Sequence, residues 1–184
     1  GFKMPKYIHT PLILKKDGDK IRKISKRLDP EARMTYYEEK GYPVYSLIEA
    51  IMTIANSNYE QWREGHPDAD FTEFEFSPKK MSSAGALFDL DKLDNISKNY
   101  LSKLKASEVF DGLDEWSKIY DTDFNALINK HKDYTISVLN IEREQKKPRK
   151  DFACFSEVKD NIWYMYNELF DGAIFDFSFL KHEE

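Results

Sequence analysis

The stretch PVYSLIEAIMTIANSNYEQWR, residues 43–63, carries the clearest periodic pattern in the sequence. Residues three or four apart lie on the same face of an α-helix, and here one such face is almost entirely apolar. The pattern therefore predicts a helix over 43–63 that forms part of the hydrophobic core. Its apolar face consists of Val44, Leu47, Ile48, Ile51, Met52, Ala55, Tyr59 and Trp62.

Helical patterns continue on both sides of this stretch. Before it, Asp29-Pro30-Glu31 combines an N-cap, a proline and an acid, and Lys40-Gly41 is a typical C-terminus. After it, an irregular segment is expected at 68–77. The later helical signals are a turn at Pro78, an N-cap at Asp89, a start at Ser107, and periodic segments at 122–131, 133–145 and 156–170. The predicted fold class is mainly α.

Residues 7–27 carry a β pattern ahead of these helices. Residues 7–14 are rich in β-forming side chains, and 15–19 form a turn signal in which Gly18 supplies a positive φ. The polar, basic stretch that follows, up to Arg27, is predicted to be a loop. The N-terminal element is therefore a small β hairpin, two short strands around a turn, that carries a basic loop.

Charge is unevenly distributed along the 184 residues, whose net charge is −5. Residues 1–27 contain nine Lys or Arg and two Asp, a net charge of +7, so the remaining residues carry −12. A basic segment on an acidic body is typical of a local anion-binding site. It also fits a charged edge hairpin that resists aggregation, and charge alone leaves both interpretations open.

Composition excludes several classes of protein. Hydrophobic residues make up 41% and charged residues 33%, which is typical of a soluble protein with one domain or two small ones. A single cysteine, Cys154, excludes an internal disulfide and a multi-cysteine zinc site, and indicates the cytosol. Cys154 is expected to be a core residue, not a nucleophile. No metal site and no membrane span are predicted, since no histidine has zinc-ligand spacing and no apolar run is long enough.

The first candidate site is KISKR, residues 23–27, which places three cations and a hydroxyl within five residues. Lysine ammonium groups can offset the charge that develops on phosphate oxygens, and Arg27 can bind two oxygens at once. Such a run can therefore hold a polyphosphate. Taken alone, it is a weak signal and is more typical of an ordinary charged surface.

Two further basic groups are candidates for contacting nucleic acid phosphates, and a solvated surface is the alternative for each. The first group is Lys79 and Lys80, and the second is Lys146, Lys147, Arg149 and Lys150. Trp62, Trp116 and Trp163 could stack on bases, but their positions on apolar helical faces favour core packing.

The KISKR run resembles the Lys-Met-Ser-Lys-Ser signature of class I aminoacyl-tRNA synthetases, which glutamyl enzymes carry as Lys-Leu-Ser-Lys-Arg or Lys-Ile-Ser-Lys-Arg. Four other segments resemble the same family, in the family's order. They are YYEEKGYP at 36–43, SAGALFDLDKL at 83–93, PRKD at 148–151 and SEVK at 156–159. The chain is thus similar to bacterial-type glutamyl-tRNA synthetases over nearly its whole length.

This resemblance implies a function and a set of roles. The family joins glutamate to its tRNA through a glutamyl-adenylate made from ATP with Mg²⁺, in enzymes that are usually monomers. Lys26 matches the catalytic second lysine of the signature, which stabilises the reacting phosphates. Lys23 and Ser25 match positions that shape the ATP-binding loop, and Arg27 replaces the final serine as in glutamyl members. The partners implied are ATP, glutamate and the tRNA for glutamate.

The family's His-x-Gly-His motif is absent from these residues. The chain is therefore expected to be a C-terminal portion that lacks the nucleotide-binding fold and is inactive by itself. Residues 1–104 would hold the end of the catalytic domain and the stem-contact region, and 105–184 a partial helical anticodon-binding domain. The aromatic tail, 171–184, would dock on the body or cover a surface left by missing sequence. A free-standing RNA-binding module, a structural helical domain and a glutaminyl-type relative stay open as alternatives.

Overall fold

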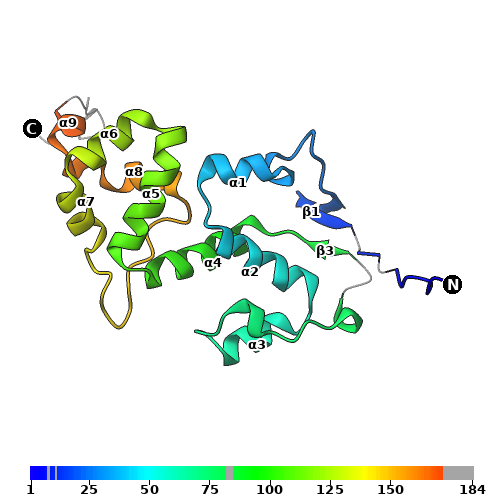
Figure 1. Cartoon of the computed structure of the whole chain (residues 1–184). Coiled ribbons are helices and arrows are strands. Elements are labelled where there is room, and N and C mark those ends of the chain that lie inside the picture. The colour runs from blue at the N-terminus through cyan, green and yellow to red at the C-terminus, as the bar shows by residue number, and fades with distance from the viewer. Residues whose placement is uncertain (8, 11, 82–84, 172–184) are drawn as a thin grey trace, which may run out of the picture.

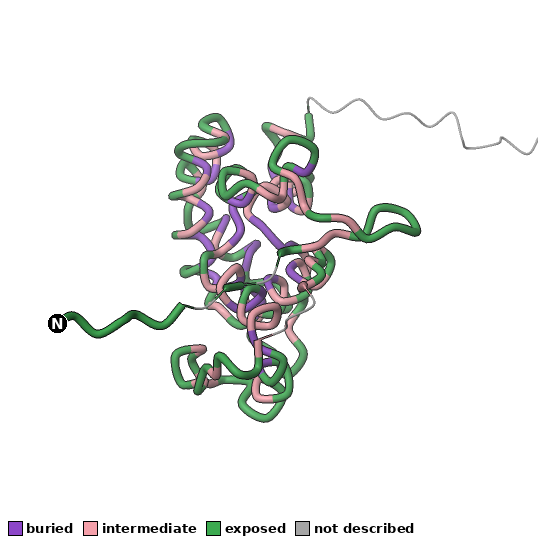
Figure 2. Tube along the Cα trace, turned by 90° about the vertical axis from the view of Figure 1, so that its right-hand side faces the viewer, coloured by how far each residue is buried: buried purple, intermediate pink, exposed green. Residues whose placement is uncertain are grey.

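The structure is a computed structural model that describes residues 1–7, 9, 10, 12–81 and 85–171. Most of its secondary structure is helical. Figure 1 shows the helices before residue 90 and a small sheet on one side, and the helices after residue 105 gathered on the other. Figure 2 shows the N-terminal segment running away from the body as an exposed trace. The prediction of a mainly α fold with a small N-terminal β element is confirmed.

The sheet has three short strands in the order β2-β1-β3. Strands β1 (Ile13–Asp17) and β2 (Lys20–Lys23) pair antiparallel across a turn in which Gly18 has a φ of 60°. Strand β3 (Ala86–Leu87) pairs parallel with the start of β1. The first strand therefore starts later than predicted, and β2 occupies residues predicted to be loop. Sequence periodicity missed β3, because two residues carry no alternation and the partner strand is distant in sequence.

The predicted helix from Asp29 to Gly41 is split. A 3₁₀ turn, η1 (Pro30–Ala32), comes first, and the extended backbone of Arg33, with a φ of −115°, separates it from α1 (Met34–Lys40). Gly41 ends α1 in the left-handed conformation with a φ of 74°, as the C-cap signal predicts. Asp29 occupies the N-cap position of this turn, as predicted, but its side chain makes no cap hydrogen bond.

The predicted helix over 43–63 is two helices, α2 (Val44–Ala55) and α3 (Tyr59–Gly65). Asn56 interrupts it, because its side-chain amide donates to the carbonyl of Ser77 at 2.9 Å and its oxygen accepts from the Asn58 amide at 3.3 Å. The apolar face is also less buried than predicted, since Val44 and Ile51 are exposed. Two 3₁₀ turns follow, η2 (Phe71–Glu73) and η3 (Pro78–Lys80).

Helix α4 (Leu90–Lys103) starts as predicted, with the Asp89 carboxylate accepting from the Lys92 amide at 3.2 Å. It packs on α2, and the residues around this contact form the N-terminal core. The buried members of the N-terminal core are Tyr37, Tyr42, Ala50, Leu93, Ala153 and Cys154. Cys154 is thus a core residue as predicted, and burial raises the pKa of its thiol to about 11.

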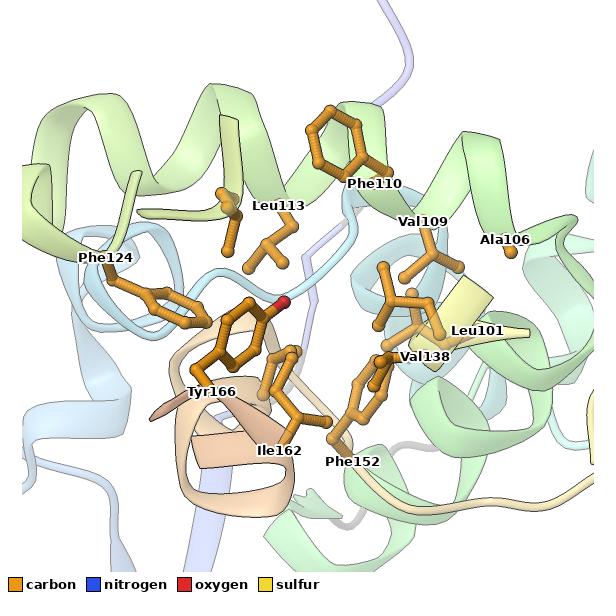
Figure 3. Close-up of a cluster of buried hydrophobic side chains, with 13 residues drawn as sticks. Leu101, Ala106, Val109, Phe110, Leu113, Phe124, Val138, Phe152, Ile162 and Tyr166 are labelled. Carbon is orange, nitrogen blue, oxygen red and sulfur yellow. The ribbon is translucent and has the colours of Figure 1, made fainter. Parts of the chain in front are cut away.

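The remaining helices are α5 (Ala106–Tyr120), α6 (Thr122–Lys130), α7 (Lys132–Leu139), α8 (Val158–Ile162) and α9 (Asn167–Phe170), with 3₁₀ turns η4 (Phe155–Glu157) and η5 (Trp163–Met165). They enclose the C-terminal core. In Figure 3 the α5 side chains Val109 and Leu113 lie on the side of the helix that faces Ile162 and Tyr166. The other buried members are Leu101, Ala106, Phe110, Phe124, Ile128, Val138, Leu139, Phe152 and Val158.

Two predicted helices of this half are shorter than expected. Helix α7 ends at Leu139 instead of 145, because the Arg143 guanidinium turns back to donate to the carbonyls of Leu139 and Leu104, at 2.9 and 3.2 Å. The segment 156–170 is broken into short pieces at Tyr166, which is extended and shares a hydrogen bond of 2.8 Å with the Thr135 hydroxyl.

The two cores meet where α1 ends. The Trp116 indole donates to the carbonyl of Glu39 at 3.1 Å, and the Phe155 amide donates to the carbonyl of Gly41 at 3.1 Å. Helix α4 also joins the two, since Leu93 lies in one core and Leu101 in the other. The boundary at 104/105, which coincides with the end of α4, stays a prediction. Residues 82–84 and the aromatic tail from 172, which is predicted to be docked, lie outside the described residues.

Candidate functional site

The KISKR segment leaves the sheet directly and forms a turn. Lys23 is the last residue of β2, and the Ile24 amide donates to the carbonyl of Ile13 at 3.1 Å, which ties the start of the loop to β1. The Ser25 carbonyl then accepts from the amides of Leu28 and Asp29, at 3.1 and 2.8 Å. The loop therefore has a fixed start and a closed turn.

Asp29 closes the other end of the loop. Its side chain is only 2% exposed, and one carboxylate oxygen accepts from the Ser25 amide at 2.7 Å. The Arg22 guanidinium binds both carboxylate oxygens, at 2.7 and 2.8 Å. A bidentate arginine–carboxylate pair fixes orientation as well as charge. Asp29 thus links β2 to the backbone of the loop.

A second cation, Lys15 of β1, contacts the same carboxylate at 3.3 Å and also pairs with Glu31. The Tyr37 hydroxyl donates to the carbonyl of Glu31 at 2.6 Å, which connects this group to α1. We call Lys15, Arg22 and Asp29 the clamp. It joins both strands of the hairpin, the loop and the start of the helical region.

The clamp is ionised at neutral pH. The bidentate bond from Arg22, and then the bond from the Ser25 amide, hold the pKa of Asp29 well below its usual range. The same bond to Asp29 raises the pKa of Arg22, and the bond to Glu31 raises the pKa of Lys15. Both clamp cations are therefore already neutralised by acids of the same fold.

The loop cations are different. Lys23, Lys26 and Arg27 are exposed, and none makes an ion pair with any residue that the structure describes. The Ser25 hydroxyl accepts from the Arg27 amide at 3.4 Å, so it contributes to the turn. The basic N-terminal segment is thus divided into cations that hold the structure and cations that remain available to an anion.

The other basic candidates lie on separate elements. Lys79 and Lys80 are exposed on η3, which is bound to the α2–α3 junction through the Ser57 amide and the carbonyl of Lys80 at 3.1 Å. The second group follows α7, in the half of the molecule that holds the C-terminal core (Figure 1). Its exposed members are Lys146, Lys147, Arg149 and Lys150, of which Arg149 pairs with Asp151.

The tryptophans pack on protein side chains. Trp62 lies 5.3 Å from the Phe74 ring and carries the Arg63 guanidinium at 4.8 Å from its ring centroid. Trp116 is partly buried against the C-terminal core, and Trp163 is partly buried on η5. Within the described ranges no group of three His, Cys, Asp or Glu side chains could hold a metal ion, and no helix is long and apolar enough to cross a membrane.

Sequence reasoning missed the clamp. Asp29 matched a helix N-cap, which is a local signal, whereas its partners Arg22 and Lys15 come from two strands. The charge excess of residues 1–27 could have been the signal, because a buried acid next to so basic a segment is expected to pair with it.

The segment 23–27 thus forms a loop anchored to the sheet, and its cations make no ion pair with the described residues. Comparison with curated proteins specifies the family. The chain is 45% identical to a glutamate–tRNA ligase of Clostridium beijerinckii over 170 residues, which are 92% of this chain and 31% of that enzyme. It is 46% identical to the Clostridium perfringens enzyme over 171 residues, and 36% identical to that of Sorangium cellulosum over 186.

The resemblance that the motifs indicated is confirmed: the chain is homologous to part of the bacterial glutamyl-tRNA synthetases. It spans about a third of the length of the curated relatives that it matches. No family model matches the chain.

Proposed function

We propose that this chain is the part of a glutamate–tRNA ligase that contacts the ATP phosphates through residues 23–27 and contacts the tRNA for glutamate through its helices. The observation that carries this proposal is the charge state of the loop. Lys23, Lys26 and Arg27 are exposed and unpaired among the described residues, whereas the cations beside them are neutralised. The homology to glutamate–tRNA ligases over 92% of the chain supports the same assignment.

The loop offers cations and hydrogen-bond donors that suit a nucleoside triphosphate. Its three free cations can offset part of the negative charge of the phosphates, and Lys26 lies at the tip of the turn, where it can approach the phosphate oxygens on which charge develops. ATP with Mg²⁺ supplies the adenylyl group that activates glutamate. We assign the metal to no residue of this chain. The chain by itself is proposed to be inactive.

The tRNA contact is proposed for the exposed basic residues of the helical part. The protein is proposed to act as a monomer. The linker Lys146, Lys147, Arg149 and Lys150 is exposed, and Lys79 and Lys80 lie on a separate turn. Lysine and arginine contacts to phosphate release counterions, so the affinity that they provide falls as salt rises.

The ATP part is tested in the glutamate–tRNA ligase that contains this segment, by measuring glutamate-dependent ATP–pyrophosphate exchange. Lys26→Ala should lower kcat by about 100- to 1,000-fold, since a preorganised cation that faces developing charge has an effect of that size. The matched control is Lys16→Ala, an exposed lysine of β1 that makes no ion pair with a described residue. Equal activity in the two variants would contradict the proposal.

A further inference from the structure

In the clamp a carboxylate pairs with two cations, directly beside a loop whose proposed function requires only unpaired cations. Asp29 is buried, and it receives three kinds of donor: the Arg22 guanidinium, the Lys15 ammonium and the Ser25 backbone amide. The first two could be explained by the stability of the hairpin. The third is different, because it acts on the backbone of the signature loop itself.

The geometry points to Asp29 as a positioning residue for the loop at 23–27, which acts by holding the Ser25 amide through a carboxylate that Arg22 orients. This inference rests on the proposed function, since it assumes that the loop binds ATP phosphates. Asp29 touches no phosphate in this scheme. It sets the conformation in which Lys23 and Lys26 are presented.

Two turn bonds and the clamp together fix both ends of the loop. The Ser25 carbonyl accepts from the Asp29 amide at 2.8 Å, and the Asp29 carboxylate accepts from the Ser25 amide at 2.7 Å, so the two residues are bonded in both directions. Only the side chains between them stay free of such bonds, with Lys26 and Arg27 exposed. A loop held at both ends in this way loses less conformational entropy when an anion binds.

A carboxylate is required for this role. Asparagine has nearly the same shape, but its amide nitrogen cannot accept a hydrogen bond, so it cannot satisfy the Arg22 fork and the Ser25 amide together. It also leaves Arg22 without a charged partner. Asp29→Asn therefore breaks the two-oxygen pairing with Arg22, which orients the acceptor of the Ser25 amide, with the smallest change of volume.

The chain offers a matched control on the same arginine. Asp17 accepts from the Nε of Arg22 at 2.6 Å, but it lies on the exposed end of the hairpin and bonds no residue of the loop. Asp17→Asn weakens the pairing of Arg22 and spares the Ser25 amide. A difference between the two variants thus reports on the loop contact and not on the charge of Arg22.

The experiment uses the glutamate–tRNA ligase that contains this segment and measures two quantities. The first is hydrogen exchange of the peptide that covers 23–29, followed by mass spectrometry. The second is the kcat and KM of ATP–pyrophosphate exchange. Asp29→Asn should speed the exchange of this peptide by about tenfold. It should also lower kcat by about 10- to 100-fold with the KM for glutamate unchanged, since a misplaced catalytic group has an effect of this size.

Two further variants keep the inference falsifiable. If Asp29→Asn does not fold, hydrogen exchange and kcat are measured in Arg22→Lys instead, because a lysine keeps the charge but cannot bind both carboxylate oxygens of Asp29. The charge swap Arg22→Asp with Asp29→Arg restores the ion pair without an acceptor for the Ser25 amide, and it should not restore kcat. Recovery of kcat in the swap would show that the pair only stabilises the fold, and would overturn the inference.

The outcomes separate the two proposals. Wild-type kcat in Asp29→Asn, beside an inactive Lys26→Ala, would overturn the positioning role and leave the proposed function standing. Unchanged hydrogen exchange in Asp29→Asn would overturn it equally. Full activity in Lys26→Ala would remove the proposed function, and the positioning role with it. Loss of kcat in Asp29→Asn but not in Asp17→Asn, with faster exchange only in the former, is the expected result.

Discussion

Each half of the molecule is stabilised internally by a different kind of interaction. In the half before residue 60 the buried polar residues are Asp29, Ser46, Glu49 and Asn56, which include both buried carboxylates of the described chain. After residue 90 they are Ser97, Ser102, Ser117 and Thr135, all of them small hydroxyl side chains, and the C-terminal core has thirteen buried apolar or aromatic members against six in the N-terminal core.

The N-terminal half therefore depends on specific polar links, and the C-terminal half on packed apolar volume. Glu49 illustrates the former: it is buried on α2 and bound by the Arg63 guanidinium, which also donates to the carbonyl of His66 at 2.8 Å. Polar links fix orientation, and a loop that presents charged side chains needs orientation more than bulk stability. The N-terminal half is therefore the part of the chain in which side-chain orientation is most tightly fixed.

The largest effect on stability is expected in the C-terminal core. Phe110 is 1% exposed on α5, and Phe110→Ala should lower the free energy of unfolding by about 4 kcal/mol, because it leaves a cavity among packed side chains. The control is Ile119→Ala on the same helix, whose side chain is 72% exposed and whose removal should cost less than about 0.5 kcal/mol. Urea unfolding of the chain measures both, and equal losses would contradict a closed core.

A smaller loss is expected when one partner of the buried pair on α2 is removed. Glu49→Leu leaves the Arg63 guanidinium without its charged partner, and should cost about 3 kcal/mol. The double variant Glu49→Leu with Arg63→Met carries no unpaired charge, and should be more stable than Glu49→Leu alone. Urea unfolding again provides the measurement. A double variant that is less stable than the single one would show that the bonds of Arg63 to the 66–69 backbone matter more than its pairing.

The smallest effect is a dependence on pH that Asp29 should confer. Its pKa is lowered in the folded chain, so the stability that it contributes is present above its unfolded pKa of about 4 and is lost as pH falls toward the lower folded value. Asp29→Asn should therefore differ most from the wild type at pH 7, and the difference should narrow by pH 2. Free energies of unfolding at pH 7, 4 and 2 decide this, and a constant difference would mean that Asp29 is not ionised in the fold.

Helices α4, α5 and α6 could be predicted well because their signals are local. These helices were predicted within one or two residues, from the cap at Asp89 and from apolar residues at helical spacing. The errors lie where a side chain bonds a distant partner, as Asn56 does with Ser77 and Arg143 with Leu104. Periodicity contains no information about such contacts.

The site shows the same limit. The loop at 23–27 can be proposed as a site from the sequence, because its cations and serine are adjacent and match a family signature. The contacts of Asp29 cannot be predicted in this way, because an aspartate before a proline is locally typical of an N-cap, and only the paired strands bring Arg22 and Lys15 to it. The role proposed for Asp29 therefore depends on the tertiary structure.

We propose above that this chain is the tRNA-contacting part of a glutamate–tRNA ligase, and a binding titration of the chain with tRNA is the decisive experiment. The chain is titrated with unmodified tRNA for glutamate and with a non-cognate tRNA, each at low and high salt. We predict a preference for the cognate tRNA that survives high salt, with weaker binding overall as phosphate contacts are screened. Equal affinity for both tRNAs that disappears at high salt, or no binding at low salt, would contradict the claim.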